Sequence, residues 1–344
     1  MKLKYIIEPF SNNVEAWNDY VYNHEWGTIY HLIQWKNAIE NTFHWKAEYY
    51  IVEKEQHICG ILPLFLIKGP LLGTRVFSIP YAVYGGILAN DKEIELELLK
   101  FAQNYTQQHE AQYLELRYLY NPGFKLPKLD SHVTFRKRIE GGPEDILQSI
   151  PRKSRASVRK GYEKFNLTVQ IDKDLDTLYR LYCLNKRKLG SPVYPKSFFK
   201  NLIEEFQKNS WIMTVYFKNI PVSSVIYFYF KDTCFPYFSG YNPKYLYTYA
   251  NNVLYYELMK ESMQRGYKNF DFGRSRVNSG PGAFKKNMGF EPIPLYYYYY
   301  LHCATEIPNI SPTNSKFKPA IRIWKKLPLP LTRIIGPQVV KYVP

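Results

Sequence analysis

The sequence predicts an α/β protein, with α+β mixed sheets, built from two similar units in tandem. Apolar residues recur at the 3.6-residue period of amphipathic helices, and shorter runs have the features of strands. The order of these elements then repeats about 160 residues later. Each half reads as helix, strand hairpin, helix and strand, which favours a mostly antiparallel sheet covered by helices.

In the first half, residues 30–43 predict a helix because four apolar side chains share one face: Leu32, Trp35, Ile39 and Phe43. Residues 47–67 read as two strands joined by a polar turn. Residues 93–119 then give a helix followed by a strand, and the helix carries an apolar stripe: Ile94, Leu98, Ala102 and Tyr105.

The second half repeats this order. Residues 194–206 carry Phe198, Leu202 and Phe206 at helical spacing, and residues 210–230 read as a strand hairpin. A helix and a strand follow within residues 251–275. A Gly-Gly-Pro sequence near residue 142 marks the boundary between the halves.

We therefore expect domains at residues 1–142 and 143–305, followed by a basic, proline-rich tail at residues 306–344. The second domain opens on a predicted helix with six cations, Arg152, Lys153, Arg155, Arg159, Lys160 and Lys164. This helix presents either a solvated charged face or a surface for phosphate groups.

Composition limits the classes of protein that are possible. The chain has 46 Lys and Arg against 30 Asp and Glu, a formal charge of +16, so an anionic partner is expected. Neither a signal peptide nor an apolar run of the roughly 18 residues needed to cross a bilayer is recognisable, which predicts a cytoplasmic protein. The four cysteines are isolated and are expected to be reduced core residues.

Several enzyme classes are excluded by the motifs that are missing. The sequence has no GxxxxGK[ST] loop, no GxGxxG between a strand and a helix, no HExxH and no GxSxG. Nucleotide hydrolysis, Rossmann cofactor binding, zinc hydrolysis and α/β-hydrolase chemistry therefore have no support, and no metal is expected.

Residues 269–290, NFDFGRSRVNSGPGAFKKNMGF, combine a strand with a glycine-rich, cationic loop. If the flanking phenylalanines face the core, Asp271 faces a cleft, because alternate strand residues point to opposite sides. Arg274 and Arg276 are candidates to bind a phosphate or carboxylate. The loop then doubles back and presents Phe284 and Lys285, with Lys286 as a neighbour.

The order of elements resembles the GNAT fold, and its repetition resembles the FemAB-like aminoacyltransferases, which are tandem GNAT units. The resemblance covers roughly residues 10–305 and includes four segments: YGGILA, RKSRASVRKG, LGSPVYPKSFF and FDFGRSRVNSGPGAFKKNMGF. The DFGRS, FK and GF pattern is similar to that of the FemAB branch found beside exosortase (PEP-CTERM) and exopolysaccharide systems.

This resemblance implies two GNAT-like domains with a cleft between them. It implies transfer of an aminoacyl or acyl group to an amine of a cell-envelope, peptide or polysaccharide precursor, peptidoglycan included. Phe284 and Lys285 match a family Phe-Lys pair that binds the acceptor end of aminoacyl-tRNA, where a cation would stabilise an oxyanion. With Asp271 they are the candidate catalytic residues.

Substrate-binding candidates come from both halves. The family's glycine-containing segment, on the acceptor side of the cleft, matches Tyr84, Gly85 and Gly86, with Tyr81 beside them. The second half contributes Arg274, Arg276, Arg187, Tyr241 and Asn252.

No resident cofactor is implied, and the donor is either an aminoacyl-tRNA or an acyl-CoA. The expected partners are anionic: the charged tRNA, or a nucleotide- or lipid-linked precursor. The usual glycine loop for CoA pyrophosphate is missing before the helix at residue 250, and no long heptad arm for tRNA is visible, so the donor stays open.

Two other functions remain possible. One is an acyl-CoA-dependent N-acetyltransferase or N-acyltransferase acting on an amino sugar. The other is a non-enzymatic module that binds an anion.

The tail is expected to pack along the second domain as irregular structure with one short helix. Its cations alternate with Trp324 and aliphatic residues, which also suits peripheral contact with the inner face of a membrane.

Overall fold

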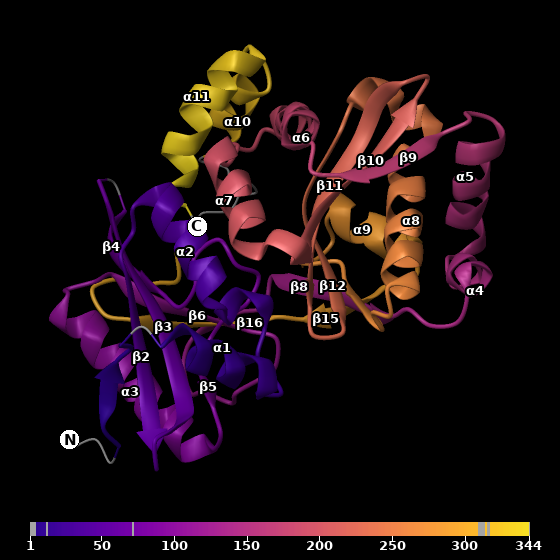
Figure 1. Ribbon diagram of the computed structural model, residues 1–344. Helices are drawn as coiled ribbons and strands as arrows, with labels where there is room; N and C mark the ends of the chain where they lie inside the picture. The colour runs from indigo at the N-terminus through magenta and orange to yellow at the C-terminus, as the bar shows by residue number, and fades with distance from the viewer. Residues whose placement is uncertain (1–4, 12, 71, 309–313, 315–316, 344) are drawn as a thin grey trace. The chain divides into compact units, whose positions relative to one another are not determined.

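The computed structural model of the chain (Figure 1) describes residues 5–11, 13–70, 72–308, 314 and 317–343. They divide into two compact units. Unit 1 is Met1–His132, Pro294–Asn309 and Lys341–Pro344, and unit 2 is Val133–Ile293 and Ile310–Val340. Each unit holds a large mixed sheet with helices, so the predicted α/β class is confirmed.

The sheet of unit 1 has the order β1-β2-β3-β4-β6-β16-β7, and β5 pairs with β3. Its strands are β1 (Ile7–Pro9), β2 (Ala47–Lys54), β3 (His57–Gly69), β4 (Gly73–Phe77), β5 (Leu88–Ala89), β6 (Tyr113–Tyr118), β7 (Lys128–Leu129) and β16 (Tyr296–Leu301). The helices are α1 (Val14–Asn23), η1 (Ile29–His31), α2 (Ile33–Phe43) and α3 (Lys92–Gln108).

Helices cover both faces of this sheet, as adjacent residues of β2 show. Tyr49 stacks on Trp17 of α1 at 4.9 Å between ring centroids, whereas Tyr50 meets Phe101 of α3 at 4.5 Å. Because successive strand residues point to opposite faces, α1 and α3 lie on opposite sides. The stripe predicted on α3 is buried against the sheet.

The sheet of unit 2 has the order β14-β8-β13-β12-β11-β10-β9, and β15 pairs with β8. Its strands are β8 (His132–Arg138), β9 (Thr168–Asp172), β10 (Ser210–Phe217), β11 (Ile220–Phe230), β12 (Thr233–Tyr241), β13 (Asn269–Asp271), β14 (Ser275–Arg276) and β15 (Glu291–Pro294). The helices are α4 (Pro143–Gln148), α5 (Arg152–Glu163), α6 (Leu175–Leu189), α7 (Lys196–Phe206), η2 (Gln207–Asn209), η3 (Pro243–Thr248), α8 (Ala250–Gln264), α9 (Gly280–Asn287), α10 (Lys318–Trp324) and α11 (Leu329–Val340).

In unit 2, α8 and α5 lie on one side of the sheet and α6 and α7 on the other (Figure 1). Adjacent residues of β11 again show the two faces. Phe228 packs on Phe206 of α7 at 5.2 Å, whereas Tyr229 stacks on Tyr267, just beyond α8, at 3.9 Å.

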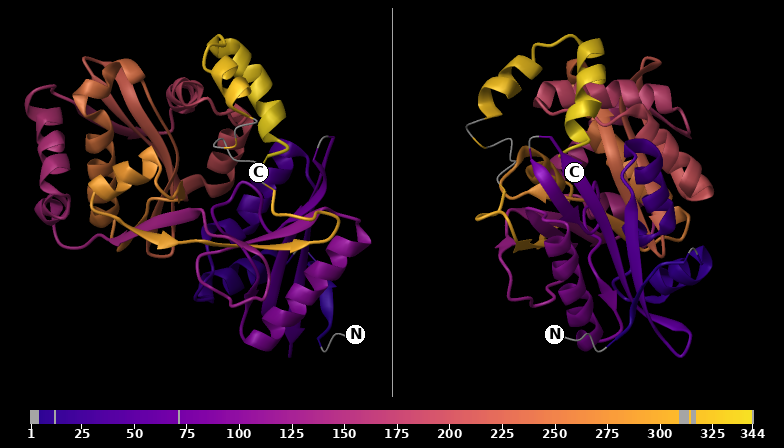
Figure 2. Two further views of the ribbon diagram at one scale, coloured as in Figure 1. Left: turned by 180° about the vertical axis from the view of Figure 1, so that it is seen from behind. Right: turned by 90° about the vertical axis from the view of Figure 1, so that its left-hand side faces the viewer.

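Two strands pair away from their neighbours in sequence. β16, the tyrosine-rich strand expected in the second half, pairs with β6 in the sheet of unit 1, with Tyr298 opposite Leu116. β8, from the end of the first half, pairs with β13 in unit 2, with Asp271 opposite Arg136. In Figure 2, β15 and β16 are the orange strands through which the chain leads back into unit 1. Such pairing is non-local, so hydrophobic periodicity cannot specify it.

Two local expectations are wrong. Residues 280–287 form a helix, α9, rather than a loop, because Ser279 caps it by accepting a hydrogen bond from Gly282 N at 3.2 Å and Pro281 lies in its first turn. The described part of the tail contains two helices, α10 and α11, rather than one. Pro330 is in the first turn of α11, where proline is tolerated.

Candidate functional site

In unit 2, two neighbouring strands separate. β12 and β13 pair in parallel over only two residues each, Thr233–Cys234 with Asn269–Phe270, although β12 continues to Tyr241. Beyond β13 the chain follows β8 instead, and the Phe272 amide donates to the Phe135 carbonyl at 2.8 Å. The remaining residues of β12, up to Tyr241, therefore do not pair with β13.

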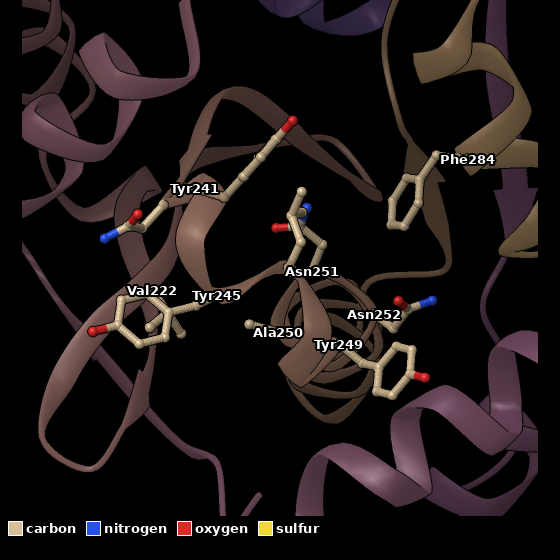
Figure 3. A pocket seen from close by; sticks show the side chains of 10 residues that line it. Val222, Tyr241, Tyr245, Tyr249, Ala250, Asn251, Asn252 and Phe284 are labelled. Atoms are coloured by element: carbon tan, nitrogen blue, oxygen red, sulfur yellow. The ribbon is translucent and has the colours of Figure 1, made fainter. Parts of the chain in front are cut away.

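A pocket of about 150 Å³ lies at the carboxyl end of β12. Three residues predicted as site residues, Tyr241, Asn252 and Phe284, are brought together in its lining, where they are joined by Asn251 and Tyr249 (Figure 3). The lining side chains of the described residues are aromatic, aliphatic or amide, and none is charged. The pocket suits a small neutral group with a few hydrogen-bonding atoms.

The N-terminus of α8 opens into this pocket through Ala250, Asn251 and Asn252. Its N-cap, Tyr249, is in the left-handed region at φ 62° and makes no side-chain capping hydrogen bond. The first backbone N–H groups of a helix lack intrahelical partners and form its positive end. The Asn252 N–H already donates to the Tyr249 carbonyl at 2.9 Å, so the N–H groups of Ala250 and Asn251 are the ones that suit an anion or a developing oxyanion.

Asp271 is not exposed to a cleft, contrary to the expectation from strand alternation. Its side chain is 1% exposed, and its Oδ1 accepts hydrogen bonds from Thr134 Oγ1 and from Gly273 N, both at 2.9 Å. Its Oδ2 lies 3.4 Å from Nε of Arg136, its cross-strand partner. Asp271 is buried because β8 supplies these groups, and β8 comes from a distant part of the sequence.

Lys285 is also buried, with 8% of its surface exposed. Its Nζ donates to the carbonyl oxygens of Gly273 at 2.7 Å and Arg274 at 3.1 Å, and it lies over the rings of Phe135 and Phe272. Burial lowers the pKa of Lys285 to about 7. Asp271 opposes this change and Arg274 adds to it. The side chain is therefore poised between its charged and neutral forms near pH 7.

Arg274 lies among other cations of unit 2. Burial and then the charge of Arg274 lower the pKa of Lys186 to about 8, and the same two causes lower the pKa of Arg276. Lys186 is at the end of α6, which packs against β12. Arg187 is the next residue of α6 and is half-buried. Arg274, a predicted site residue, thus interacts electrostatically with the predicted Arg276 and with Lys186, which was not predicted.

Tyr255 is a second residue that the sequence analysis missed. It lies on α8, its ring is 4.3 Å from Phe272 and 5.8 Å from Phe284, and its hydroxyl interacts with Ser239 of β12. Burial raises the pKa of Tyr255 to about 12. The hydroxyl therefore stays protonated and is a hydrogen-bond donor. Only its helical spacing was visible in the sequence, which is equally typical of a core residue.

The candidates from the first half lie in the interior of unit 1. Tyr84 is 2% exposed, and Tyr84, Gly85 and Gly86 border a hollow of only about 10 Å³. The Gly86 carbonyl lies 3.0 Å from His31 Nε2, and a Cβ at Gly86 would clash with Tyr118. In this structure these residues pack the core of unit 1, and the hollow has no room for a substrate.

Cofactor and membrane signals are also limited. In the part of the chain that the structure describes, no three His, Cys, Asp or Glu side chains are grouped to hold a metal ion. No helix there has the length and apolarity to cross a bilayer. Cys59, Cys183 and Cys234 are buried as expected, but Cys303 is exposed.

A protein-family model matches much of unit 2. Residues 148–286 match the family model described as "Acetyltransferase (GNAT) domain". This range spans α5 to α9 and includes the pocket of unit 2. None of the curated proteins with which the sequence was compared matches it.

Solved structures show the same fold. The FemX crystal structure has a TM-score of 0.66 at 16% identity, covering 86% of this chain and 98% of FemX. A tandem GNAT protein from the clavulanic acid biosynthesis pathway has a TM-score of 0.56 at 8% identity, covering 87% and 98%. The C-terminal domain of a putative lysylphosphatidylglycerol synthetase from Agrobacterium fabrum has a TM-score of 0.54 at 11% identity, covering 83% and 91%. The chain thus has the fold of tandem GNAT-like domains.

Proposed function

We propose that this chain, with its tandem GNAT-like fold, is a cytoplasmic FemAB-like transferase that moves an aminoacyl or acyl group onto an amine of a cell-envelope, peptide or polysaccharide precursor. The observation that carries the proposal is the neutral pocket of about 150 Å³ at the end of β12, beside the uncapped N-terminus of α8. The DFGRS and FKKNMGF segments support placement in the exosortase- and exopolysaccharide-associated branch.

The pocket would hold the acyl group. Its volume suits a small side chain, and Asn251 and Asn252 offer amide groups to orient the carbonyl. Ser223 Oγ donates to Asn251 Oδ1 at 2.6 Å, which fixes that amide and leaves its NH₂ group as a donor. Positioning of this kind lowers the barrier because the reactants no longer have to find one another.

In the reaction, the acceptor amine attacks the carbonyl carbon of the donor and a C–N bond forms. The C–O bond of a tRNA ester, or the C–S bond of a thioester, then breaks. The amine loses a proton to water or a substrate phosphate, and the leaving oxygen or sulfur gains one. Tyr255 lies behind Phe272 and Phe284 and is not part of the pocket lining, so the leaving group would take its proton from water or from the attacking amine.

Positive charge would stabilise the oxyanion formed on the way. Lys285 follows Phe284, which lines the pocket, and its ammonium group donates to the Gly273 and Arg274 carbonyl oxygens, so we propose that its charge acts on the oxyanion through this turn. Removing a comparable stabilising group typically lowers kcat by about 10²–10³-fold. Arg274, Arg276 and Lys186 would hold the phosphate groups of the donor or the acceptor, as the basic composition suggests.

The experiment supplies purified protein with charged tRNAs, acetyl-CoA or longer acyl-CoAs, together with candidate amines, and measures the mass of the product. We expect turnover that Lys285→Met lowers by about 10²-fold. Lys286→Met is the matched control, because Lys286 is the next residue of α9 and is exposed. Equal rates for the Lys285 variant would remove Lys285 from the mechanism, and no turnover of any donor would contradict the proposal.

One observation favours a second function, acyl-CoA-dependent N-acylation of an amino sugar. The open N-terminus of α8 is suited to a pyrophosphate even without the usual glycine loop. Thermal stabilisation by acetyl-CoA, but not by charged tRNA, would favour this reaction. Stabilisation by charged tRNA alone would favour the first.

A further inference from the structure

Helix α11 buries a face of small side chains and exposes an apolar face. Its inward face carries Thr332, Gly336 and Val340, which are buried at a spacing of four residues. A Cβ at Gly336 would lie 2.8 Å from the Val193 backbone nitrogen, so α11 is pressed against the α6–α7 connection. α11 also packs along α6 in unit 2 (Figures 1 and 2).

The outward face of α11 is apolar. Leu331, Ile334, Ile335 and Val339 are spaced three and four residues apart, which places them on one side of a helix, and all four are exposed. Ile334 is 68% exposed. A surface helix normally turns its apolar stripe towards the core, and here the small residues face the core instead. We call these four residues the α11 stripe.

The preceding helix, α10, carries exposed cations. Lys318, Arg322, Lys325 and Lys326 lie on or just after α10 and are exposed, next to Ile323, which is 62% exposed. From residue 307 to residue 344 the sequence has seven Lys and Arg and no Asp or Glu. The segment thus joins uncompensated positive charge to exposed aliphatic side chains.

We propose that the α10–α11 surface docks unit 2 on an anionic lipid bilayer. Aliphatic side chains of an interfacial helix enter the boundary between headgroups and acyl chains, while the cations bind acidic headgroups. α11 has 12 residues, about 18 Å of helix, which is too short to span a bilayer and fits a helix lying in its plane. The combination of uncompensated cations with exposed aliphatic side chains favours an acidic bilayer, because its headgroups bind the cations and its acyl chains take up the aliphatic groups.

This inference does not depend on the proposed function. Both components are expected to contribute, since polybasic attraction or shallow apolar insertion alone gives weak, reversible binding. Binding is therefore expected only with acidic lipids, and it is expected to fall when either component is removed.

The test is co-sedimentation of the full chain with vesicles of phosphatidylcholine alone or with phosphatidylglycerol added. We expect binding only to the acidic vesicles, and a loss of about tenfold or more in Ile334→Glu/Ile335→Glu. Ile220→Glu is the matched control, because Ile220 is as exposed as Ile335, both at 41%, but lies on β11. It is expected to bind like the parent.

The charge requirement has its own control on α5. Arg322→Gln/Lys326→Gln is expected to lose binding about tenfold or more. Lys153→Gln/Lys160→Gln removes the same amount of charge from α5, which is distant in sequence from the α11 stripe. This variant is expected to bind like the parent. Equal loss in both pairs would mean non-specific attraction and would overturn the assignment to α10–α11.

A second readout is independent of affinity. In a Cys303→Ser background, a polarity-sensitive dye on Val339→Cys is expected to shift to the blue with acidic vesicles, whereas a dye on Ile220→Cys is not. Unchanged sedimentation of the Ile334→Glu/Ile335→Glu variant would overturn the proposal. So would a parent dimer in solution that this variant converts to monomers, because the stripe would then be a protein interface.

Discussion

The side-chain nitrogen of Lys285 lies 2.7 Å from the carbonyl oxygen of Gly273, which joins α9 to the turn that follows β13. The Gly273 amide in turn donates to Asp271 at 2.9 Å. One peptide turn is therefore held from both sides, by a buried lysine and a buried carboxylate. The consequences for stability and activity can be measured separately.

Stability is expected to rise with pH because of Lys285. Its pKa is lowered from 10.5 to about 7 in the folded protein, so between these values the unfolded chain binds more protons than the native one. The free energy of unfolding then gains up to about 1.4 kcal/mol per pH unit from this residue. Urea unfolding at pH 7 and pH 9 measures it. Lys285→Met should show a smaller rise, and an identical rise in both proteins would contradict the lowered pKa.

Activity is expected to change in the opposite direction. If the charged form of Lys285 stabilises the oxyanion, its contribution to kcat is present below about pH 7 and is lost as the pH rises further. The measurement is the kcat profile from pH 6 to 9 for the parent and for Lys285→Arg, which keeps its charge. A parent rate that increases through pH 7 with the same limb missing in Lys285→Arg would instead make Lys285 a general base.

Replacing Asp271 is expected to lower the free energy of unfolding of unit 2, by less for asparagine than for alanine. Asp271→Asn keeps an oxygen for Thr134 and Gly273 but places an NH₂ group towards Arg136, at a cost of about 1–3 kcal/mol. Asp271→Ala leaves all three donors without this acceptor and costs about 3–5 kcal/mol. Urea denaturation compares them. Similar, small losses for both would show that the buried carboxylate contributes little.

The pocket wall can be tested through Phe284. Phe284→Ala widens the pocket and should raise KM for the acyl donor about tenfold or more, with a smaller effect on KM for the acceptor. Phe284→Leu, which restores most of the apolar volume, should recover part of this loss. Equal effects on both substrates would indicate general damage to α9, which circular dichroism and a melting curve would check.

Gly240 is expected to be indispensable for packing. A Cβ at this position would lie 2.1 Å from the Tyr182 backbone nitrogen, because α6 crosses β12 there. Gly240→Ala should therefore lower the free energy of unfolding by about 3 kcal/mol or more. Gly280→Ala is the control: beyond its chain neighbours and the backbone of its own helix, a Cβ at Gly280 would meet no atom within 4 Å, so the change should stay within about 0.5 kcal/mol. Parent-like stability of Gly240→Ala would mean that α6 can move away from β12.

Much of this protein was predictable from local sequence. The helical stripe through Ile94 and Leu98, the hairpins and the α/β class all depend on periodicity within a few turns, and the structure confirms them. The prediction that Phe284 and Tyr241 belong to one site depended on the resemblance to a family, in which similar motifs occur in the same order. Local pattern alone would not have joined two residues that are 43 positions apart in the chain.

Tertiary structure alone decided the rest. The alternation of strand residues predicted that Asp271 faces outwards. In the structure, β8, which lies more than 130 residues earlier in the sequence, pairs with β13 and buries Asp271 beneath Thr134 and Arg136. The same burial lowers the pKa of Lys285, and the packing of α11 on Val193 decides which of its faces is left exposed. The sequence determined which segments become helices and strands, because those preferences are local. Strand pairing, burial and protonation depend on neighbours that only the folded chain brings together.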